Sequence, residues 1–581
     1  MANARLLEEF PRVSTAEWEA AIARDLKGAD YQKRLIWRAE DRITVKPYYR
    51  ASDLKDLAAM GSAPGEFPFR RGSRPDGAWI IREEIDASDV AEANRAACAA
   101  VAAGAEGIAF TRLSVGGSAE LEAALADLDK IPVHFEIGNE KLLRLLMERR
   151  KLQGGGTQLS TGCDALAKAK FAAEIVRGAP DGFVPFTIQA AFEEKGAACI
   201  QEIGFALAAG IDFLALLAEH GVEAKRAAGA LEFNFAIGAN YFFEIAKLRA
   251  FRMLWARAAE CFGAAPENSR ARISARTSRW NKTIYDPHAN ILRATTEAMA
   301  AIIGGADAVS VAPFDECFKA PDEASRRLAR NTQLLLKHEV LLGRVADAGG
   351  GAYYVEALTD ELAREAWGKM QEIEARGGFR KAKAEGWIAQ AMESSLAVRE
   401  IAVEKRRRVF SGTNQFANPA ERALERVDMS WMNGRRRGTC AYEDLRLRTE
   451  WRVAETSERP RVLLAEIGDA KMRSARANFA MNFFACAGFA IETRRFISTA
   501  RIAAAKADLI VLCSADEEYA GLAARLLPKL KALGRKTPVI VAGNPANAPE
   551  LEAAGISGFV HLRSSPVEVL TKWQQRLGIG S

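Results

Sequence analysis

Short apolar runs alternate with alanine-rich helical patterns along most of this chain. In its middle part, runs with strand character fall at 78–85, 107–112, 133–137, 184–189, 231–237, 273–277, 308–312 and, more weakly, 352–356. Helical patterns such as 91–103 and 197–209 separate them. Strands that alternate with helices imply a parallel sheet. Eight such units within about 250–300 residues predict a closed (β/α)8 barrel of the TIM type.

A second alternating series begins at Arg461 and continues to the end of the chain. Its predicted strands are 462–467, 490–495, 509–513, 538–542 and 558–562. Five parallel strands in about 120 residues suit a flavodoxin-like, doubly wound domain. The fold class is therefore α/β, with a barrel followed by a smaller sheet domain.

The same pattern divides the chain into four parts. Residues 1–75 read as an N-terminal arm, with a helix start near Ser14. The stretch at 61–69 is rich in proline and glycine, which suits a segment that lies over another surface. Residues 76–425 form the barrel with trailing helices, and the polar, irregular pattern of 426–459 predicts a linker. Residues 460–581 form the last domain.

Composition narrows the functional classes. A length of 581 residues exceeds one hydrophobic core, and 49% hydrophobic with 27% charged residues is typical of soluble globular proteins. The net charge is +6, but the basic clusters at 405–408 and 435–437 are short and favour a solvated helix face or linker over nucleic acid or acyl-CoA phosphates. We find no apolar run approaching the ~20 residues of a membrane span and no signal-peptide core, and the eight cysteines lie far apart. We expect a cytoplasmic protein with reduced thiols and neither nucleic acid nor membrane as a partner.

Ordered motifs in the barrel half resemble the methylmalonyl-CoA mutase family. Those in the family's order and spacing are Ala-Arg-Thr-Ser-Arg-Trp at 275–280, Tyr-Asp-Pro-His-Ala-Asn at 285–290, Glu-Ala-Met-Ala-Ala at 297–301 and Phe-Asp-Glu at 314–316. The resemblance extends from the arm, at 45–49, to the last domain. It implies a protein of a family that interconverts (R)-methylmalonyl-CoA and succinyl-CoA through adenosylcobalamin radicals. In that family the acyl-CoA threads the barrel, and the last domain holds the corrin over one end.

The loop at 469–474 departs from the family pattern. Catalytic members carry Asp-x-His-x-x-Gly there, in which the histidine binds cobalt and the aspartate orients it. Here Asp469 remains, but Lys471 replaces the histidine and Ser474 the glycine. A lysine ammonium has three donors and no free lone pair, so in that state it cannot ligate cobalt.

The catalytic Tyr-His pair of the family is also replaced. In catalytic chains the pair precedes a Gln-Glu-Ala-Gly run, which here reads Glu-Glu-Lys-Gly at 193–196 and places Ala190 and Ala191 at the Tyr and His positions. A methyl group can neither crowd an adenosyl group nor donate to a thioester carbonyl. The nearest histidines in the sequence are His134 and His220.

Other motifs of the family are also altered in this chain. The His-Thr-Asn before Phe-Asp-Glu becomes the run at 310–313, beginning with Ser310. The Ser-x-Leu that contacts the corrin tail becomes Cys513-Ser514-Ala515. His561 could act as a substitute ligand, but a surface or core histidine is favoured. We therefore expect no catalytic, cofactor-binding or metal-ligating residue in this chain.

An aromatic run in the barrel offers a further interpretation. It comprises Phe233, Phe235, Tyr241, Phe242 and Phe243. These rings could line a ligand tunnel, but filling of the barrel and its helix interface is favoured. That filling would close the route that acyl-CoA takes in active chains.

Within the family, the chain resembles the small, non-catalytic subunit of a heterodimeric mutase. The resemblance implies that the large catalytic subunit binds adenosylcobalamin and that this chain, inactive alone, stabilises it within an isomerase complex. Two alternatives stay open. The chain could be an active acyl-CoA mutase with a displaced cobalamin site, or a binding or regulatory protein that reuses the fold without a mutase partner.

Overall fold

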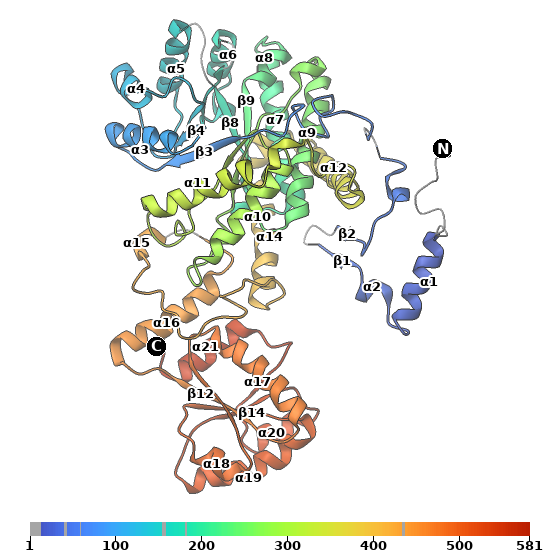
Figure 1. Cartoon of the computed structure of the whole chain (residues 1–581), viewed down its shortest axis with the longest axis vertical. Coiled ribbons are helices and arrows are strands. Elements are labelled where there is room, and N and C mark those ends of the chain that lie inside the picture. Colours follow the sequence, from blue (N-terminus) through green and yellow to red (C-terminus); the bar gives the residue numbers. More distant parts are fainter. Residues whose placement is uncertain are drawn as a thin grey trace, which may run out of the picture.

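The computed structural model describes residues 13–39, 43–57, 60–153, 158–180, 183–432 and 436–580. Figure 1 shows three regions: an arm at the N-terminal end, the barrel, and a smaller domain at the opposite pole from the barrel. The elements of the arm are α1 (Thr15–Asp25), α2 (Tyr31–Arg34), β1 (Trp37–Arg38), β2 (Thr44–Val45) and the 3-10 helix η1 (Ala51–Leu54). The helix start predicted near Ser14 is confirmed, because its hydroxyl and Glu17 form a capping box at α1.

In the described part of the chain, nine strands form one parallel sheet that closes into a barrel. They are β3 (Ile80–Ile85), β4 (Gly107–Phe110), β5 (Val133–Phe135), β6 (Leu159–Thr161), β7 (Phe183–Val184), β8 (Phe186–Gln189), β9 (Leu231–Ile237), β10 (Ile273–Thr277) and β11 (Ala308–Ser310). The sheet runs β7-β6-β5-β4-β3-β11-β10-β9-β8. Only Pro185, which has no backbone donor, separates β7 from β8, so the two ends of the order are halves of one strand and the ring has eight strands. The predicted (β/α)8 barrel is confirmed.

Helices surround the barrel. They are α3 (Val90–Ala102), α4 (Ser118–Leu125), α5 (Glu140–Gln153), α6 (Ala169–Gly178), α7 (Cys199–Glu219), α8 (Ala224–Gly229), α9 (Tyr241–Cys261), α10 (Ala289–Ile303), α11 (Glu323–His338) and α12 (Tyr353–Glu374), followed by α13 (Phe379–Ala384) and α14 (Trp387–Glu404). Small residues allow close approach between them. A Cβ at Gly210 of α7, for example, would lie 2.5 Å from the Trp255 ring of α9.

One predicted barrel strand is wrong. Residues 352–356, whose aromatic and β-branched content suggested a strand, begin helix α12. Tertiary contacts override the local propensity, since Glu356 in the first turn of this helix binds Arg70 and Arg249. The eighth strand is instead β6, which the pattern did not predict because it has three residues and two of them are polar.

The long helix α7 is apolar enough to pass a test for membrane spans, with a mean hydropathy of 1.7 over the window tested. However, 78% of that window is buried inside the molecule. Such burial is expected of a core helix, and α7 packs against both α9 and α12.

The segment predicted as an irregular linker contains α15 (Met429–Met432) and α16 (Cys440–Thr456). Helix α16 contacts both large regions. Its Glu450 accepts a hydrogen bond from the Tyr285 hydroxyl of the barrel region at 2.9 Å, and its Thr449 accepts one from Gln574 of the last domain at 2.9 Å. The boundaries of the four parts remain predictions.

The last domain is a five-stranded parallel sheet flanked by helices. Its elements are β12 (Arg461–Glu466), α17 (Ala470–Ala485), β13 (Ala490–Arg495), α18 (Thr499–Ala504), β14 (Leu509–Cys513), η6 (Asp516–Glu518), α19 (Tyr519–Ala532), β15 (Val539–Ala542), α20 (Ala548–Ala553), β16 (Phe559–Val560) and α21 (Pro566–Arg576). The strand order is β13-β12-β14-β15-β16, which is the flavodoxin-like order predicted from the sequence.

Candidate functional site

The positions expected for a catalytic Tyr-His pair lie at the carboxyl end of β8. Ala190 is fully buried, and Ala191 precedes the 3-10 helix η3 (Phe192–Lys195). The next side chain that enters this region is Glu193, which accepts hydrogen bonds from Arg399 at 2.5 Å and from the Ser278 hydroxyl at 2.7 Å. The polar contacts here are therefore made by residues that follow the alanine pair.

Arg276 of β10 is the centre of an ion-pair network at this end of the barrel. Its Nε lies 2.8 Å from Glu84 of β3, and its Nη2 lies 2.7 Å from Glu316. Arg279 lies 2.9 Å from the same Glu316, and Glu194 lies 3.8 Å from Arg276. Burial opposes the charge, but the carboxylates of Glu316, Glu84 and Glu194 outweigh it and raise the pKa of Arg276 well above its usual range.

A second layer lies deeper in the barrel. Arg82 of β3 binds Glu232 of β9 at 3.0 Å, and Gln158 donates to the other oxygen of Glu232 at 2.9 Å. Burial alone would raise the pKa of Glu232, but Arg82, His134 and Ser274 lower it to about 2. This carboxylate is therefore ionised over the physiological pH range.

His134 lies near the Arg82–Glu232 pair. It is the nearest histidine before the alanine pair in the sequence. It is 2.9 Å from the Ser160 hydroxyl of β6 and 3.2 Å from Glu136, which also accepts a hydrogen bond from Gln189 at 2.9 Å. His220 ends α7 and is bonded to the Leu216 carbonyl. Of the two histidines weighed from the sequence, only His134 is tied to the polar groups of the barrel strands.

The aromatic run lies elsewhere. Phe233 and Phe235 of β9 stack edge-on against Phe251 of α9 at centroid distances of 4.6 and 4.8 Å. Because side chains alternate along a strand, Glu232 and Asn234 face the opposite way, into the barrel. The rings fill the helix interface as expected, but the expectation that they also fill the barrel is wrong: charged and amide side chains fill it.

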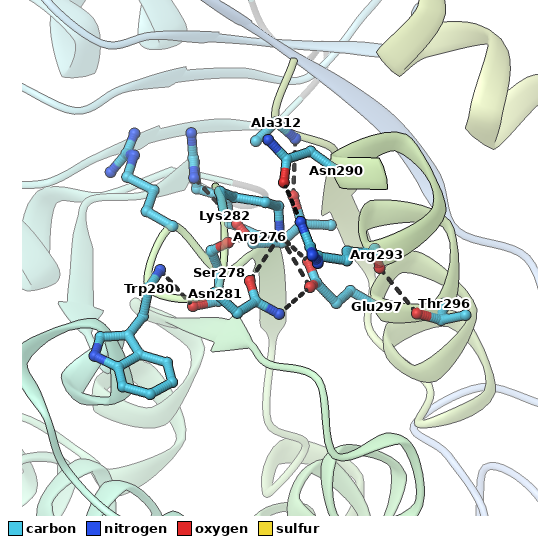
Figure 2. Close-up of polar contacts among 12 residues, drawn as sticks. Arg276, Ser278, Trp280, Asn281, Lys282, Asn290, Arg293, Thr296, Glu297 and Ala312 are labelled. Atoms are coloured by element: carbon cyan, nitrogen blue, oxygen red, sulfur yellow. Dashed lines mark hydrogen bonds and ion pairs between the residues drawn. The ribbon is translucent and has the colours of Figure 1, made fainter. Parts of the chain in front are cut away.

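The loop after β10 is bonded to helix α10 (Figure 2). Lys282 Nζ lies 2.7 Å from Glu297 of α10, and Asn281 donates to the same carboxylate at 2.6 Å. Burial raises the pKa of Glu297 to about 7, against the effect of Lys282. Ala312, in the run that begins with Ser310, has no polar side chain, and its backbone N–H donates to the Thr277 hydroxyl at 2.8 Å.

In the last domain, Asp469 serves as a helix cap. Its carboxylate accepts a hydrogen bond from the Met472 N–H at 2.8 Å at the start of α17. Lys471 is exposed in the first turn of the same helix, and Ser474 is half-buried one turn later. The aspartate that orients a histidine in catalytic relatives thus has a different partner in this chain.

Glu518 and Tyr519 occupy the carboxyl edge of the sheet. Glu518 accepts hydrogen bonds from the Ser514 hydroxyl and the Asp469 N–H, so it joins the loops after β12 and β14. A Cβ at Gly468, which has a positive φ of +81°, would collide with this carboxylate. The Tyr519 hydroxyl donates to the Ala542 carbonyl at 2.7 Å, which joins the start of α19 to the end of β15.

The other predicted positions of this domain make local contacts. Cys513 is fully buried in β14, and burial raises the pKa of its thiol. Ala515 precedes η6. His561 lies in the loop after β16 and accepts a hydrogen bond from the Arg563 N–H at 3.2 Å, while burial and the cations of Arg563 and Arg476 lower its pKa.

These features define an α/β protein in which an eight-stranded barrel with a charged interior precedes a flavodoxin-like domain. A family model described as methylmalonyl-CoA mutase matches residues 38–115 and 183–476. The chain belongs to the methylmalonyl-CoA mutase family.

Relatives that match along the whole chain are named as small subunits. The methylmalonyl-CoA mutase small subunit of Porphyromonas gingivalis is 36% identical over 99% of both chains. The protein of the same name from Streptomyces virginiae is 34% identical over 99% of this chain and 98% of its own. A methylmalonyl-CoA mutase of Rhizobium meliloti is 30% identical over 70% of this chain and 65% of its own.

The cofactor that the family implies is a cobalamin, and the residues of the 469–474 loop do not fit it. The third position offers an exposed amine instead of an imidazole, and the aspartate is used as a cap. Glu518 and Ser514 already bridge the two loops at this edge. Among the residues that the structure describes, no group of three or more His, Cys, Asp or Glu side chains is arranged to hold a metal ion.

Proposed function

We propose that this chain is the small, non-catalytic subunit of a cytoplasmic, heterodimeric methylmalonyl-CoA mutase. The large subunit of that complex binds adenosylcobalamin and isomerises the substrate, and this chain stabilises it. The names of the full-length relatives support the class of subunit. The alanines at 190 and 191 and the lysine at 471 support the absence of catalysis.

The observation that carries the proposal is the charged interior of the barrel. In catalytic relatives the acyl-CoA threads this space. Here Arg276 joins Glu84 and Glu316, and Arg82 joins Glu232, through the same space. Opening it would leave buried charges without partners, at a cost of several kcal/mol each. The network therefore favours a supporting role over substrate binding.

Co-expression with a large subunit that has an intact Asp-x-His-x-x-Gly loop tests the proposal. We expect the two chains to copurify, succinyl-CoA to be isomerised by the complex, and this chain alone to be inactive and to remain colourless with adenosylcobalamin. A monodisperse chain that ignores the large subunit would refute the proposal. Corrin absorbance with activity in this chain alone would favour an active mutase with a displaced site.

A matched pair of variants locates the chemistry within the complex. Lys471→Ala in this chain should leave the activity of the complex unchanged, because an exposed lysine contributes no ligand. Replacement of the loop histidine of the large subunit should abolish it. Loss of activity with the Lys471→Ala variant would contradict the assignment.

A further inference from the structure

A cavity of about 500 Å³ lies beside the carboxyl end of the barrel and is not part of the charged interior. Four parts of the chain form its walls: strand β1 of the arm, the segment from η3 into α7, the loop 238–240 with the start of α9, and the end of α14 with the residues after it. Its volume is within the range of ligand pockets, about 300–1,000 Å³.

Four arginines line this cavity from two different segments, and one of them, Arg399 of α14, pairs with Glu193. Arg38 belongs to the arm, and Arg407 and Arg408 follow α14. In the part of the chain that the structure describes, the exposed side chains of Arg38 and Arg407 have neither a hydrogen bond nor an ion pair. The guanidinium of Arg408 is stacked over Trp280, 4.5 Å from the ring centroid. Guanidinium groups bind phosphate and carboxylate bidentately, so their convergence favours an anion.

The three carboxyl groups of the cavity do not cancel this charge, because two other cations pair with them and burial favours the protonated form of Glu202. Lys247 lies 2.6 Å from Glu202 and 2.5 Å from Glu244, and Arg399 lies 2.5 Å from Glu193. Burial raises the pKa of Glu202 to about 8. This wall can therefore both accept and donate hydrogen bonds near neutral pH, as hydroxyl groups of a ligand require.

The remaining wall is aromatic. Trp37 is 47% exposed and contacts the edge of Phe243, with ring centroids 5.7 Å apart. An exposed indole held by a neighbouring ring offers a face on which a planar group can stack. The cavity thus combines an anion subsite, hydroxyl partners and a stacking platform.

We propose that this cavity binds a nucleoside phosphate. The phosphate lies against Arg38, Arg407 and Arg408, the base stacks on Trp37, and the ribose faces Glu244 and Asn240. The nucleotide could be free or could be the nucleotide end of a coenzyme A molecule, since the chemistry is shared. The inference does not depend on the role of the chain as a subunit.

Titration of the full chain with adenosine monophosphate tests this site by calorimetry and by quenching of tryptophan fluorescence. We expect the double variant Arg38→Ala/Arg407→Ala to weaken binding roughly tenfold or more, since two charge-assisted contacts are lost. Trp37→Leu should weaken binding and reduce the quenching. Lys405→Ala removes a neighbouring exposed cation that does not line the cavity and should leave binding within about twofold.

Other ligands test the anion subsite, the stacking platform and the source of the nucleotide separately. Adenosine that binds as tightly as the monophosphate would overturn the anion subsite, and inorganic phosphate that binds as tightly would overturn the role of the ring. No heat with adenosine monophosphate at millimolar concentration, or equal losses in the double variant and Lys405→Ala, would overturn the site itself. Competition by coenzyme A supports the coenzyme as the source, and the absence of competition supports a free nucleotide.

Discussion

At the residue scale, Arg276 holds the carboxyl end of the barrel together. It is buried, and two carboxylates contact it at 2.7 and 2.8 Å. We expect Arg276→Met to destabilise the chain by about 1.5–3 kcal/mol, because the partly buried Glu84 would lose its ion pair and the partly buried Glu316 would keep only Arg279. Equilibrium unfolding in urea measures the difference.

Arg279 provides the matched control for this prediction. It contacts the same Glu316 at 2.9 Å, but its side chain is 45% exposed. Arg279→Met should therefore cost about 1 kcal/mol or less, as exposed ion pairs do. Similar losses in the two variants would contradict the view that burial makes Arg276 the central residue.

Glu232 gives the barrel an acid-dependent stability. Its pKa falls from the ordinary 4.5 to about 2 in the folded chain. A depressed carboxyl pKa contributes stability that is complete above the unfolded pKa and is lost as pH falls through the folded one, here about 3 kcal/mol between pH 5 and 2. The difference in unfolding free energy between the chain and Glu232→Gln should therefore shrink as pH falls over that interval. A difference that stays constant with pH would show that another group controls acid unfolding.

At the element scale, the start of α17 explains why Asp469 persists without a histidine beside it. The carboxylate satisfies the Met472 N–H, which has no partner inside the helix. Asp469→Ala should cost about 1 kcal/mol, and Asp469→Asn much less, since asparagine caps equally well. Lys471→Ala should stay within about 0.5 kcal/mol. Thermal unfolding of the three variants checks the order, and a large loss in Asp469→Asn would indicate a role that requires the charge.

At the scale of the whole molecule, the arm divides into two halves that are attached differently. Arg70 in the second half forms a buried ion pair with Glu356 at 2.7 Å. In the first half, α1 buries no residue and packs on the following segment, where Trp18 stacks on Tyr48 at 5.0 Å. In the described part of the chain, α1 is bonded to Tyr48 and Arg50 of the arm, and Figure 1 shows that it lies away from the barrel.

Removal of residues 1–35, among which the described residues 13–35 are not buried, should therefore separate folding from assembly. We expect the truncated chain to unfold within a few degrees of the full chain, because the buried barrel core, which begins at Ala39, and the Arg70 pair remain. Recovery of the large subunit in a pull-down should fall sharply. The single variant Trp18→Ser should weaken recovery less. Full recovery by the truncated chain would assign the interface to another surface.

The sequence predicted the elements whose patterns are strong and local. The apolar run 509–513 and the run 231–237, in which apolar and polar residues alternate at first, both became strands. The barrel and the sheet domain followed from the number and spacing of such runs. It also identified the altered positions at 190, 191 and 471, since replacement of a chemical group is a property of the residue itself. Strand β6 was not predicted, because three residues are too few to show a period. Residues 352–356 were predicted as a strand, but they begin a helix whose Glu356 pairs with arginines far along the chain.

What fills the barrel was decided only by the tertiary structure. The alternation of Arg82 with Glu84, and of Glu232 with Asn234, is visible in the sequence and could have indicated a polar interior. Which carboxylate meets which guanidinium depends on the closure of the sheet, which places β3 near β9 and β10. The sequence by itself determined the family pattern and its missing groups. The closed fold determined that charged pairs occupy the barrel interior, because only there do strands distant in the chain bring their side chains together.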